Sequence, residues 1–327
     1  MLESLSGLDE LLVEIDERGH PRDLKDRSKV GGLLVAINRN ASGLEDPEKT
    51  GRELVAVLGE LGERAASVAT GSEQELWDLL RSAEEREQRV ILVGGDGTVH
   101  AAANAPLRRL PELALVPIGR ANNIARALGI PVSRVDALAV AAGAPAQPID
   151  ALRVATPDRF IFAVEAVSAG FQAEARAGYD AENSADLWQG VKALVRAVRR
   201  FRPYGASVEL GDRRLRSSEA AQLFFSNLPY FGFGFEVDPG ADPSDGRLEA
   251  ILIEARGRGR LMRLLAAARR GRHIGRRGVS RVSATRARLT EPLPLVADAV
   301  PLGVTTATVS VESARLRVAS HRPGATA

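Results

Sequence analysis

The sequence predicts an α/β domain built on a parallel sheet, followed by an all-β domain that forms an antiparallel β-sandwich. In residues 30–149, short apolar runs alternate with stretches of helical periodicity, and strands that alternate with helices form parallel sheets covered on both faces. From residue 150 onward the sequence is a succession of β-rich runs, which is typical of a sandwich. A chain of 327 residues is long enough for two such domains.

The first domain is expected to open with a buried strand at 32–38. Residues 1–29 are interpreted as an N-terminal extension with one short helix over 8–15. The remaining expected elements, in order, are a helix at 47–61, a strand at 64–69, a helix at 73–83, a strand at 90–93, a helix after 98, a strand at 113–117 and a helix starting near 122. Ligands of such sheets bind beyond the carboxyl ends of the strands. The turns after 38, at 94–98 and at 119–122 are therefore expected to converge on one edge.

The second domain is expected to cover 150–312. Its predicted strands are 151–155, 160–169, 206–210, 220–227, 248–253, 279–289 and 306–311. One helical insertion, 185–201, is expected to interrupt them.

Composition excludes several kinds of site. The chain has 45% hydrophobic and 26% charged residues, as an ordinary globular protein does. It has no cysteine, which excludes disulfides, thiolate metal sites and cysteine nucleophiles. No apolar run approaches the ~20 residues of a membrane span, and the N-terminus lacks a signal-like segment. We therefore expect a cytoplasmic protein that meets lipid, if at all, from the inner membrane surface.

A basic run separates Glu254 from Glu291, with twelve arginines and no acidic residue between them. Part of it is expected to form an amphipathic helix over 261–270, with leucines on one face and arginines on the other. Such a helix suits an anionic membrane surface, and it is equally compatible with a solvated face. Because no aromatic residues are interleaved with the arginines, nucleic-acid binding is not expected.

The most informative stretch is an apolar strand that runs into the turn Gly94–Thr98, with the sequence GGDGT. Glycines remove the Cβ atoms that would keep a polyphosphate from the backbone. Exposed amides followed by a helix N-terminus suit anions. Asp96 would repel a bare phosphate, so it implies a magnesium ion or a hydroxyl to deprotonate. The combination indicates a nucleotide and phosphoryl transfer, whereas an isolated turn of this kind would be as consistent with a plain strand-to-helix connection.

A second motif, Pro117–Arg126, has the form PxGxxNxxAR. With GGDGT, in this order and spacing, it resembles the diacylglycerol kinase catalytic family, which includes sphingosine kinases and bacterial lipid kinases. The resemblance extends from about residue 30 to about 318, while the Walker A and dinucleotide-binding patterns are absent at this turn. It implies ATP and Mg²⁺, a lipid hydroxyl as acceptor, nucleotide between the domains, and a tail (313–327) whose strand returns to the first domain.

The resemblance assigns site residues in the first domain. For nucleotide binding these are Asn38, Ser42, Gly43, Thr70, Gly94, Gly95, Asp96, Gly97, Thr98, Gly119, Arg120 and Asn122, with the amides and the Thr98 hydroxyl on phosphate and Asp96 on the catalytic magnesium. The resemblance assigns substrate binding to Asn123 and Arg126. The first domain departs from the pattern at three places: the loop after Asn38 lacks a proline and has one residue too many before Ser42, Arg120 stands where threonine is common, and Asn123 stands where aspartate is common.

A second metal is implied in the second domain. The segment Pro239–Leu248 resembles the family signature P-x-A-x-x-x-D-G-x-L, on which relatives hold a structural magnesium. This assigns the side chain of Asp245 and the backbone oxygens of Asp242 and Arg247 to the ion. A plain Asp-Gly hairpin turn is the competing interpretation.

The largest departure lies near the C-terminus. Relatives have Asp-Gly-Glu there, with the glutamate as the expected general base, whereas this chain has Asp298, Ala299 and Val300. Valine cannot accept a proton, and a general base contributes ~10²–10⁴-fold to the rate. Asp298 is the candidate catalytic replacement, provided that its loop is rotated.

Three functions follow from these features. The first is an ATP- and magnesium-dependent kinase for diacylglycerol or a related lipid. The second is a catalytically degenerate regulator that binds nucleotide or lipid, favoured by Val300, Arg120 and Asn123. The third is a kinase for a non-lipid alcohol. NAD kinases share GGDGT, but their later Gly-Ser-Thr-Ala-Tyr signature is absent. The sequence leaves open the acceptor, the nucleotide preference and whether the protein forms a homodimer.

Overall fold

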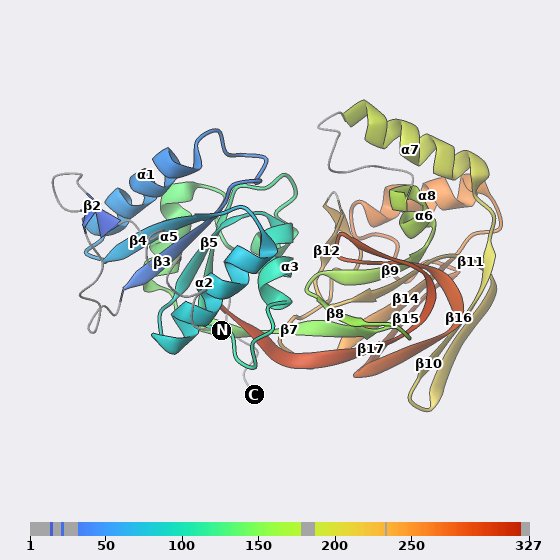
Figure 1. Ribbon diagram of the computed structural model, residues 1–327. Helices are drawn as coiled ribbons and strands as arrows, with labels where there is room; N and C mark the ends of the chain where they lie inside the picture. The colour runs from blue at the N-terminus through green and yellow to red at the C-terminus, as the bar shows by residue number, and fades with distance from the viewer. Residues whose placement is uncertain (1–13, 16–20, 23–31, 178–186, 233, 322–327) are drawn as a thin grey trace. The chain divides into compact units, whose positions relative to one another are not determined.

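The computed structural model describes residues 14–15, 21–22, 32–177, 187–232 and 234–321. The chain divides into two compact units: unit 1 comprises residues 1–149 and 314–327, and unit 2 comprises 150–313 (Figure 1). Most of the helix expected over 8–15 lies outside the described residues. Its last two positions, Glu14–Ile15, form strand β1, which pairs with β2 (Pro21–Arg22).

A parallel sheet forms the centre of unit 1. Its strands are β3 (Leu33–Asn38), β4 (Ala65–Thr70), β5 (Val90–Gly94), β6 (Leu113–Pro117) and the end of β17 (Val300–Ala319). Their order is β17-β6-β5-β3-β4, and every pair is parallel. Strands β5 and β6 are buried along their whole length, which explains why they are uniformly apolar.

Helices cover both faces of this sheet. Helices α1 (Pro47–Glu60) and α5 (Arg134–Gly143) pack on one face, and α2 (Glu73–Glu85) and α3 (Asp96–Ala103) pack on the other. The local sequence sets their starts, because Asp46, Ser72 and Ser133 each accept a backbone amide three residues on. A fifth helix, α4 (Asn123–Ala127), is short and contacts α3.

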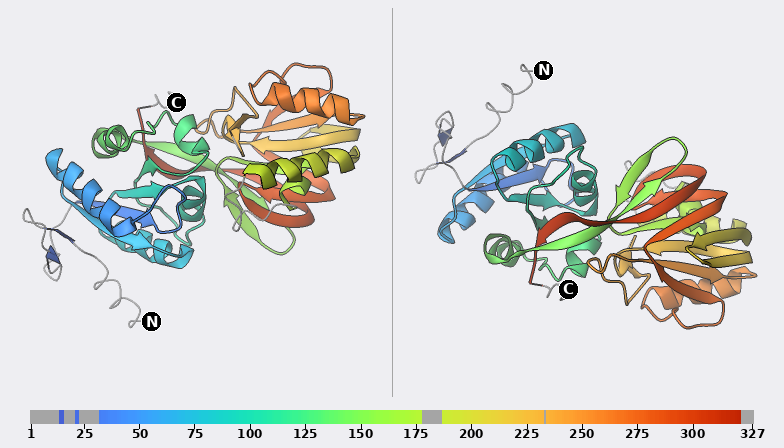
Figure 2. Two further views of the ribbon diagram at one scale, coloured as in Figure 1. Left: turned by 90° about the horizontal axis from the view of Figure 1, so that it is seen from above. Right: turned by 90° about the horizontal axis from the view of Figure 1, so that it is seen from below.

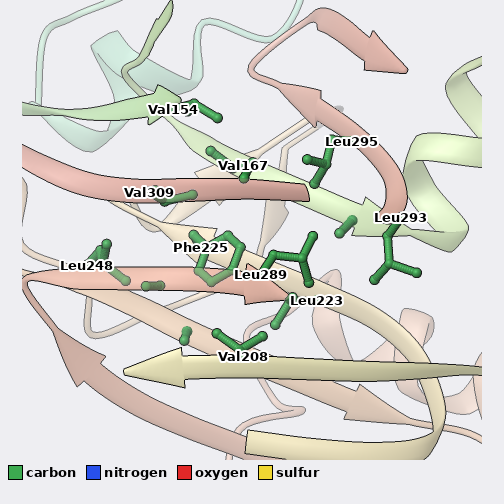
Figure 3. Packing of buried hydrophobic residues seen from close by; sticks show 14 of the residues in the cluster. Val154, Val167, Val208, Leu223, Phe225, Leu248, Leu289, Leu293, Leu295 and Val309 are labelled. Atoms are coloured by element: carbon green, nitrogen blue, oxygen red, sulfur yellow. The ribbon is translucent and has the colours of Figure 1, made fainter. Parts of the chain in front are cut away.

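Unit 2 is made of antiparallel strands. They are β7 (Ala146–Ala155), β8 (Phe160–Ala163), β9 (Ala166–Gly170), β10 (Tyr204–Leu210), β11 (Arg213–Ser226), β12 (Tyr230–Phe231), β13 (Phe235–Glu236), β14 (Leu248–Glu254), β15 (Val279–Ala284), β16 (Arg286–Ala297) and most of β17. The main path is β15-β14-β11-β10-β16-β17, and β9 bridges β11 and β16. Alternate residues of these strands, such as Leu223 and Phe225, point into one apolar core (Figure 3).

Three helices cover one side of these strands: α6 (Phe171–Ala177), α7 (Leu187–Arg200) and α8 (Arg258–Ala268). Figure 2 shows α7 and α8 over the same face of unit 2 when it is seen from above. A second core lies beneath them, where Leu261 and Leu264 of α8 join Phe224 and Ile251 of the sheet. These leucines belong to the apolar stripe expected for the helix over 261–270.

The fold class, α/β plus antiparallel all-β, is confirmed. Several strand boundaries differ from expectation. The strand predicted at 160–169 is two strands, β8 and β9, and the strand predicted at 220–227 is the longer β11, which begins at Arg213. The strand predicted at 279–289 is two strands, β15 and β16, which break at Thr285. The runs at 306–311 and 314–318 belong to the single 20-residue strand β17. β-forming residues stand on both sides of Thr285 and on both sides of the junction within β17. Strand propensity therefore gives no signal for these two boundaries.

Candidate active site

Three loops meet at the carboxyl edge of the unit 1 sheet. The loop after β3 reaches α3, because Asn38 Nδ2 donates a hydrogen bond of 2.9 Å to Thr98 Oγ1. The loop after β6 joins the turn after β5, because the Ile118 amide donates to the Gly94 carbonyl at 3.0 Å. The site residues expected after β3, β5 and β6 are therefore brought together on unit 1.

Glycines allow these loops to touch. A Cβ atom on Gly119 would lie 2.6 Å from the Gly95 Cα, and one on Gly43 would lie 2.3 Å from the Ile118 carbonyl oxygen. Cβ contacts below 3.0 Å essentially never occur in proteins. The glycines of the loops after β3 and β6 are thus needed for the loops to pack against one another.

The start of α3 has the properties of an anion site. Its N-cap is Gly95, and no side chain caps the helix. The next glycine, Gly97, is exposed, and an added Cβ would meet nothing within 4 Å. The first amides of a helix lack intrahelical acceptors and carry partial positive charge. The space beside Gly97, on the side where a Cβ would project, is open, so the phosphate contact expected at this turn stays a prediction that the geometry allows.

Asp96 connects the two sequence motifs. Its carboxylate oxygens accept hydrogen bonds from the Asn123 and Ile124 amides, each at 3.0 Å. These amides begin α4, whose own N-cap residue, Asn122, has the left-handed φ of 49° and makes no side-chain cap. Asp96 thus caps a helix 27 positions further along the chain. Whether it also binds magnesium stays a prediction.

The two threonines of the predicted site face inward. The Thr98 hydroxyl accepts the Asn38 amide, and a Cβ on Gly94 would lie 2.1 Å from it. The Thr70 hydroxyl donates to the Ile37 carbonyl at 3.4 Å. Both side chains are buried. This geometry favours a structural role for Thr98, which holds the turn closed, over the phosphate contact that the resemblance implies.

The other expected residues of unit 1 differ in exposure. Ser42, Arg120 and Arg126 are exposed at this edge, where arginine side chains suit oxyanions. Asn123 is 1% exposed, so its side chain packs inside unit 1. The geometry therefore favours the two arginines over Asn123 as contacts for a bound substrate.

A cavity of about 10 Å³ lies under the GGDGT turn, lined by Leu92, Val99, Leu115 and Ala125 among others. This volume is at the lower limit for one water molecule. It lies beneath the start of α3, and it is too small for a nucleotide.

In unit 2, the Asp298 carboxylate anchors the hairpin between β16 and β17. Its oxygens accept the amides of Val164, Glu165 and Ala166 at 2.8, 2.8 and 3.2 Å. The residue itself is 8% exposed, and its φ is 49°. A carboxylate that satisfies three buried amides is poorly placed to take a proton from an acceptor. The geometry therefore argues against Asp298 as the general base.

The segment with the expected structural metal holds three carboxylates. Asp245 accepts the Arg247 amide, Asp242 accepts the Ser244 amide, and Asp150 accepts the Gly246 amide at 2.8 Å. Burial raises the pKa of the Asp245 carboxyl, and the nearby charges of Asp242 and Asp150 raise it further. Asp150, which the sequence analysis did not single out, thus joins this loop from the start of unit 2.

No group of three or more His, Asp or Glu side chains in the described part of the chain is arranged to hold a metal ion. The magnesium expected on Asp245, with backbone oxygens of Asp242 and Arg247, is therefore a proposal that depends mainly on carbonyl ligands. The repulsion among the three carboxylates supports this proposal, because a bound cation would relieve it.

Magnesium is expected to stabilise unit 2 through Asp245. The raised pKa means that the ionised carboxyl is disfavoured in the fold, so its contribution to stability is present at low pH and is lost as pH rises. Without metal, Asp245→Asn should therefore leave the melting temperature at pH 7 unchanged or higher. At ten times its Kd, Mg²⁺ should raise the melting temperature of the wild type by roughly 3–6 °C. It should raise the melting temperature of the variant by much less. Equal shifts in calorimetry would contradict the site.

Family models match nearly the whole described chain. Residues 32–154 match the diacylglycerol kinase catalytic domain, and residues 165–320 match the YegS C-terminal NAD kinase beta sandwich-like domain. The chain belongs to the diacylglycerol kinase catalytic family. Among curated relatives, this family member is 27% identical over 249 residues to the diacylglycerol kinase of Bacillus subtilis (strain 168), covering 73% of this chain and 80% of the relative.

Other relatives agree with this assignment. The diacylglycerol kinase of Mycobacterium tuberculosis is 24% identical over 267 residues, covering 79% of this chain and 84% of the relative. A crystal structure of a diacylglycerol kinase from Bacillus anthracis str. Sterne superposes with a TM-score of 0.66 at 17% identity, covering 91% of this chain and all of that one. At this identity the structural likeness shows the fold alone.

Proposed function

We propose that this family member transfers the γ-phosphate of ATP to the hydroxyl of a diacylglycerol-like lipid. The observation that carries the proposal is the uncapped N-terminus of α3, with the open position at Gly97. This helix start would place a bound anion beside the acidic residue Asp96, and both belong to a motif of a kinase family. The names of the curated relatives support diacylglycerol as the class of acceptor.

Each site residue has a part in this proposal. The amides at the start of α3 bind phosphate oxygens, and Arg120 and Arg126 are exposed at the same edge for further oxyanion contacts. Asn38 orients Thr98 and so keeps the turn in place. Asp96 holds the second motif against the first and binds magnesium through its carboxylate. When bound, Mg²⁺ neutralises charge that develops on the β- and γ-phosphates.

Val300 favours a second candidate, a regulator that binds nucleotide or lipid without turnover. The residue is aliphatic where the resemblance implies a general base. A third candidate, a kinase for a non-lipid alcohol, needs the same nucleotide site with a different acceptor.

The test is ADP production from ATP and Mg²⁺ over a panel of acceptors. The panel contains diacylglycerol and other lipid alcohols in mixed micelles, and soluble alcohols such as glycerol. We expect turnover that depends on the lipid. Turnover with soluble alcohols alone would support the third candidate, and ATP binding without turnover would support the regulator.

We further propose that α7 and α8 touch anionic lipid from the surface. No helix in the described part of the chain is long and apolar enough to span a bilayer. Arg269, Arg270, Arg276 and Arg277 are exposed around α8, whereas Arg281 turns inward to pair with Asp238 at 3.0 Å. Large apolar side chains are also exposed on these helices, namely Val195 on α7 and Met262 on α8. Cations beside exposed apolar groups suit the lipid headgroup region.

Charge reversal of those four exposed arginines to glutamate should abolish binding to phosphatidylserine vesicles at low salt. Each cation near an anionic surface contributes about 1 kcal/mol, so the affinity should fall by roughly 10²-fold or more. The matched control reverses Arg52, Arg86, Arg108 and Arg109, which are exposed on unit 1 and change the net charge equally. Equal losses in vesicle sedimentation for both variants would mean that net charge, and not this surface, governs binding.

A further inference from the structure

The C-terminal end of α3 is held by an arginine from the last strand. Arg315 of β17 donates from Nε to the Ala103 carbonyl, the last of the helix, at 2.9 Å. Its Nη2 and Nη1 donate to the carbonyls of Ala105 and Leu107, in the segment that follows, at 2.8 and 2.9 Å. All of these residues belong to unit 1.

The opposite end of the same helix is the GGDGT turn. We propose that Arg315 is a positioning residue for nucleotide binding, which holds α3 so that its first amides meet the phosphates. The inference rests on the proposed function, because that function places the phosphates at this turn. It adds a residue that lies far from them and acts through the helix.

The composition of α3 explains why such an anchor is needed. The helix has eight residues, and its buried second half contains three consecutive alanines, Ala101–Ala103. Helices are held in register by side chains that pack between those of a neighbouring element. Alanine side chains are short and interlock weakly, so packing restrains this helix less than longer side chains would. Hydrogen bonds at its end add the restraint.

Arginine suits this task better than any other side chain. The last carbonyls of a helix lack intrahelical donors, and a cation beside them is favoured by the helix dipole. The guanidinium is planar and presents its N–H groups in fixed directions. Three bonds to three carbonyls therefore fix both the place and the direction of the helix end. A lysine would supply the charge from one flexible nitrogen.

The sheet connects Arg315 to the strand that carries the turn. Val318, three residues after Arg315, pairs with Leu113 of β6, and β6 pairs with β5. Strand β5 leads directly into GGDGT. Both ends of α3 are thus tied to one parallel sheet. Since an eight-residue helix is a rigid rod about 12 Å long, a displacement at the anchored end is transmitted to the turn.

The competing interpretation is that Arg315 only stabilises the fold. A residue of that kind changes the free energy of unfolding and leaves the ATP affinity of the folded protein unchanged. A positioning residue also changes the affinity and the location of the helix. Trp77 of α2 reports that location, because its Nε1 donates to the Ala101 carbonyl of α3 at 2.8 Å.

The experiment compares Arg315→Met and Arg315→Lys with wild type by titration calorimetry with ATP and Mg²⁺, at a temperature where circular dichroism shows every variant folded. We expect Arg315→Met to bind ATP about 10-fold more weakly, since a shift of about 1 Å in a bound group can cost more than this. The KM for the lipid should not change. Arg315→Lys should have an intermediate affinity, because it returns the charge without the fork.

The matched control is Arg317→Met. Arg317 lies on the same strand and carries the same charge, but it donates to Glu112 and to the Ala146 carbonyl, at 3.4 and 3.2 Å. This variant should retain wild-type affinity. The fluorescence of Trp77 is measured with the chain's other tryptophan, Trp188, replaced by phenylalanine. Its emission should shift in Arg315→Met and should be unchanged in Arg317→Met.

Wild-type ATP affinity or wild-type Trp77 emission in a folded Arg315→Met would overturn the inference and leave the proposed function intact. If Arg315→Met does not fold, Arg315→Lys carries the same test, and wild-type values in that variant would overturn the inference. A wild type without measurable affinity for ATP would overturn the proposed function, and the inference with it.

Discussion

Gly97→Ala should weaken ATP binding by on the order of 10²-fold while the protein stays folded. The Cβ would project into the space where we place the phosphates, because nothing in the protein lies within 4 Å of it. Displacing a bound group by about 1 Å can cost 10²-fold. Alanine is also a better helix former than glycine by up to ~1 kcal/mol, so stability should not fall. Titration calorimetry with ATP and thermal melting measure the two effects separately.

The matched control is Gly59→Ala in α1. This glycine is also exposed and helical, and its Cβ would likewise meet nothing within 4 Å. It should share the gain in stability and retain full ATP affinity. Gly95 is less suitable for this test, because its Cβ would lie 3.0 Å from the Gly119 Cα and would disturb the packing of the loops. If Gly97→Ala keeps full affinity for ATP, the nucleotide does not bind at this turn.

Asp298→Ala should destabilise unit 2 by about 3–5 kcal/mol. Three amides lose a charged acceptor in a buried place, and buried donors without partners cost about 1–3 kcal/mol each, with partial relaxation. Alanine also disfavours the φ of 49°. Asp298→Asn tolerates this backbone conformation, so it isolates the loss of the carboxylate and should cost less. Chemical denaturation monitored by circular dichroism gives both values.

Asp212→Ala serves as the control for this prediction. Asp212 is an exposed aspartate at the turn between β10 and β11, so its removal should change stability by less than about 0.5 kcal/mol. If Asp298→Ala is as stable as this control, the hairpin does not depend on its aspartate. A folded Asp298→Asn that has lost turnover would return the role of base to Asp298.

The sequence predicted the parts of the fold that have local signals. Buried strands such as β5 can be recognised as uniform apolar runs, and glycine-rich turns mark where they end. The convergence of three loops followed from a general property of parallel sheets, and the contacts from Asn38 to Thr98 and from Ile118 to Gly94 show it. The break at Thr285 had no such signal, because both flanks are β-forming.

The roles of individual site residues were harder to predict, since they depend on contacts between distant positions. Asp96 appeared in the sequence as a metal ligand, and its bonds to the amides of Asn123 and Ile124 could not be read from the motif itself. The three amides on Asp298 come from residues more than 130 positions away.

The most direct measurement of the central claim follows the γ-phosphate itself. Wild-type protein is incubated with γ-labelled ATP, Mg²⁺ and diacylglycerol in mixed micelles, and the lipid extract is separated and counted. We predict label in a phosphorylated diacylglycerol, dependent on Mg²⁺ and lost in Gly97→Ala but retained in Gly59→Ala. An extract without label from a protein that binds ATP normally would contradict the assignment of this chain as a lipid kinase.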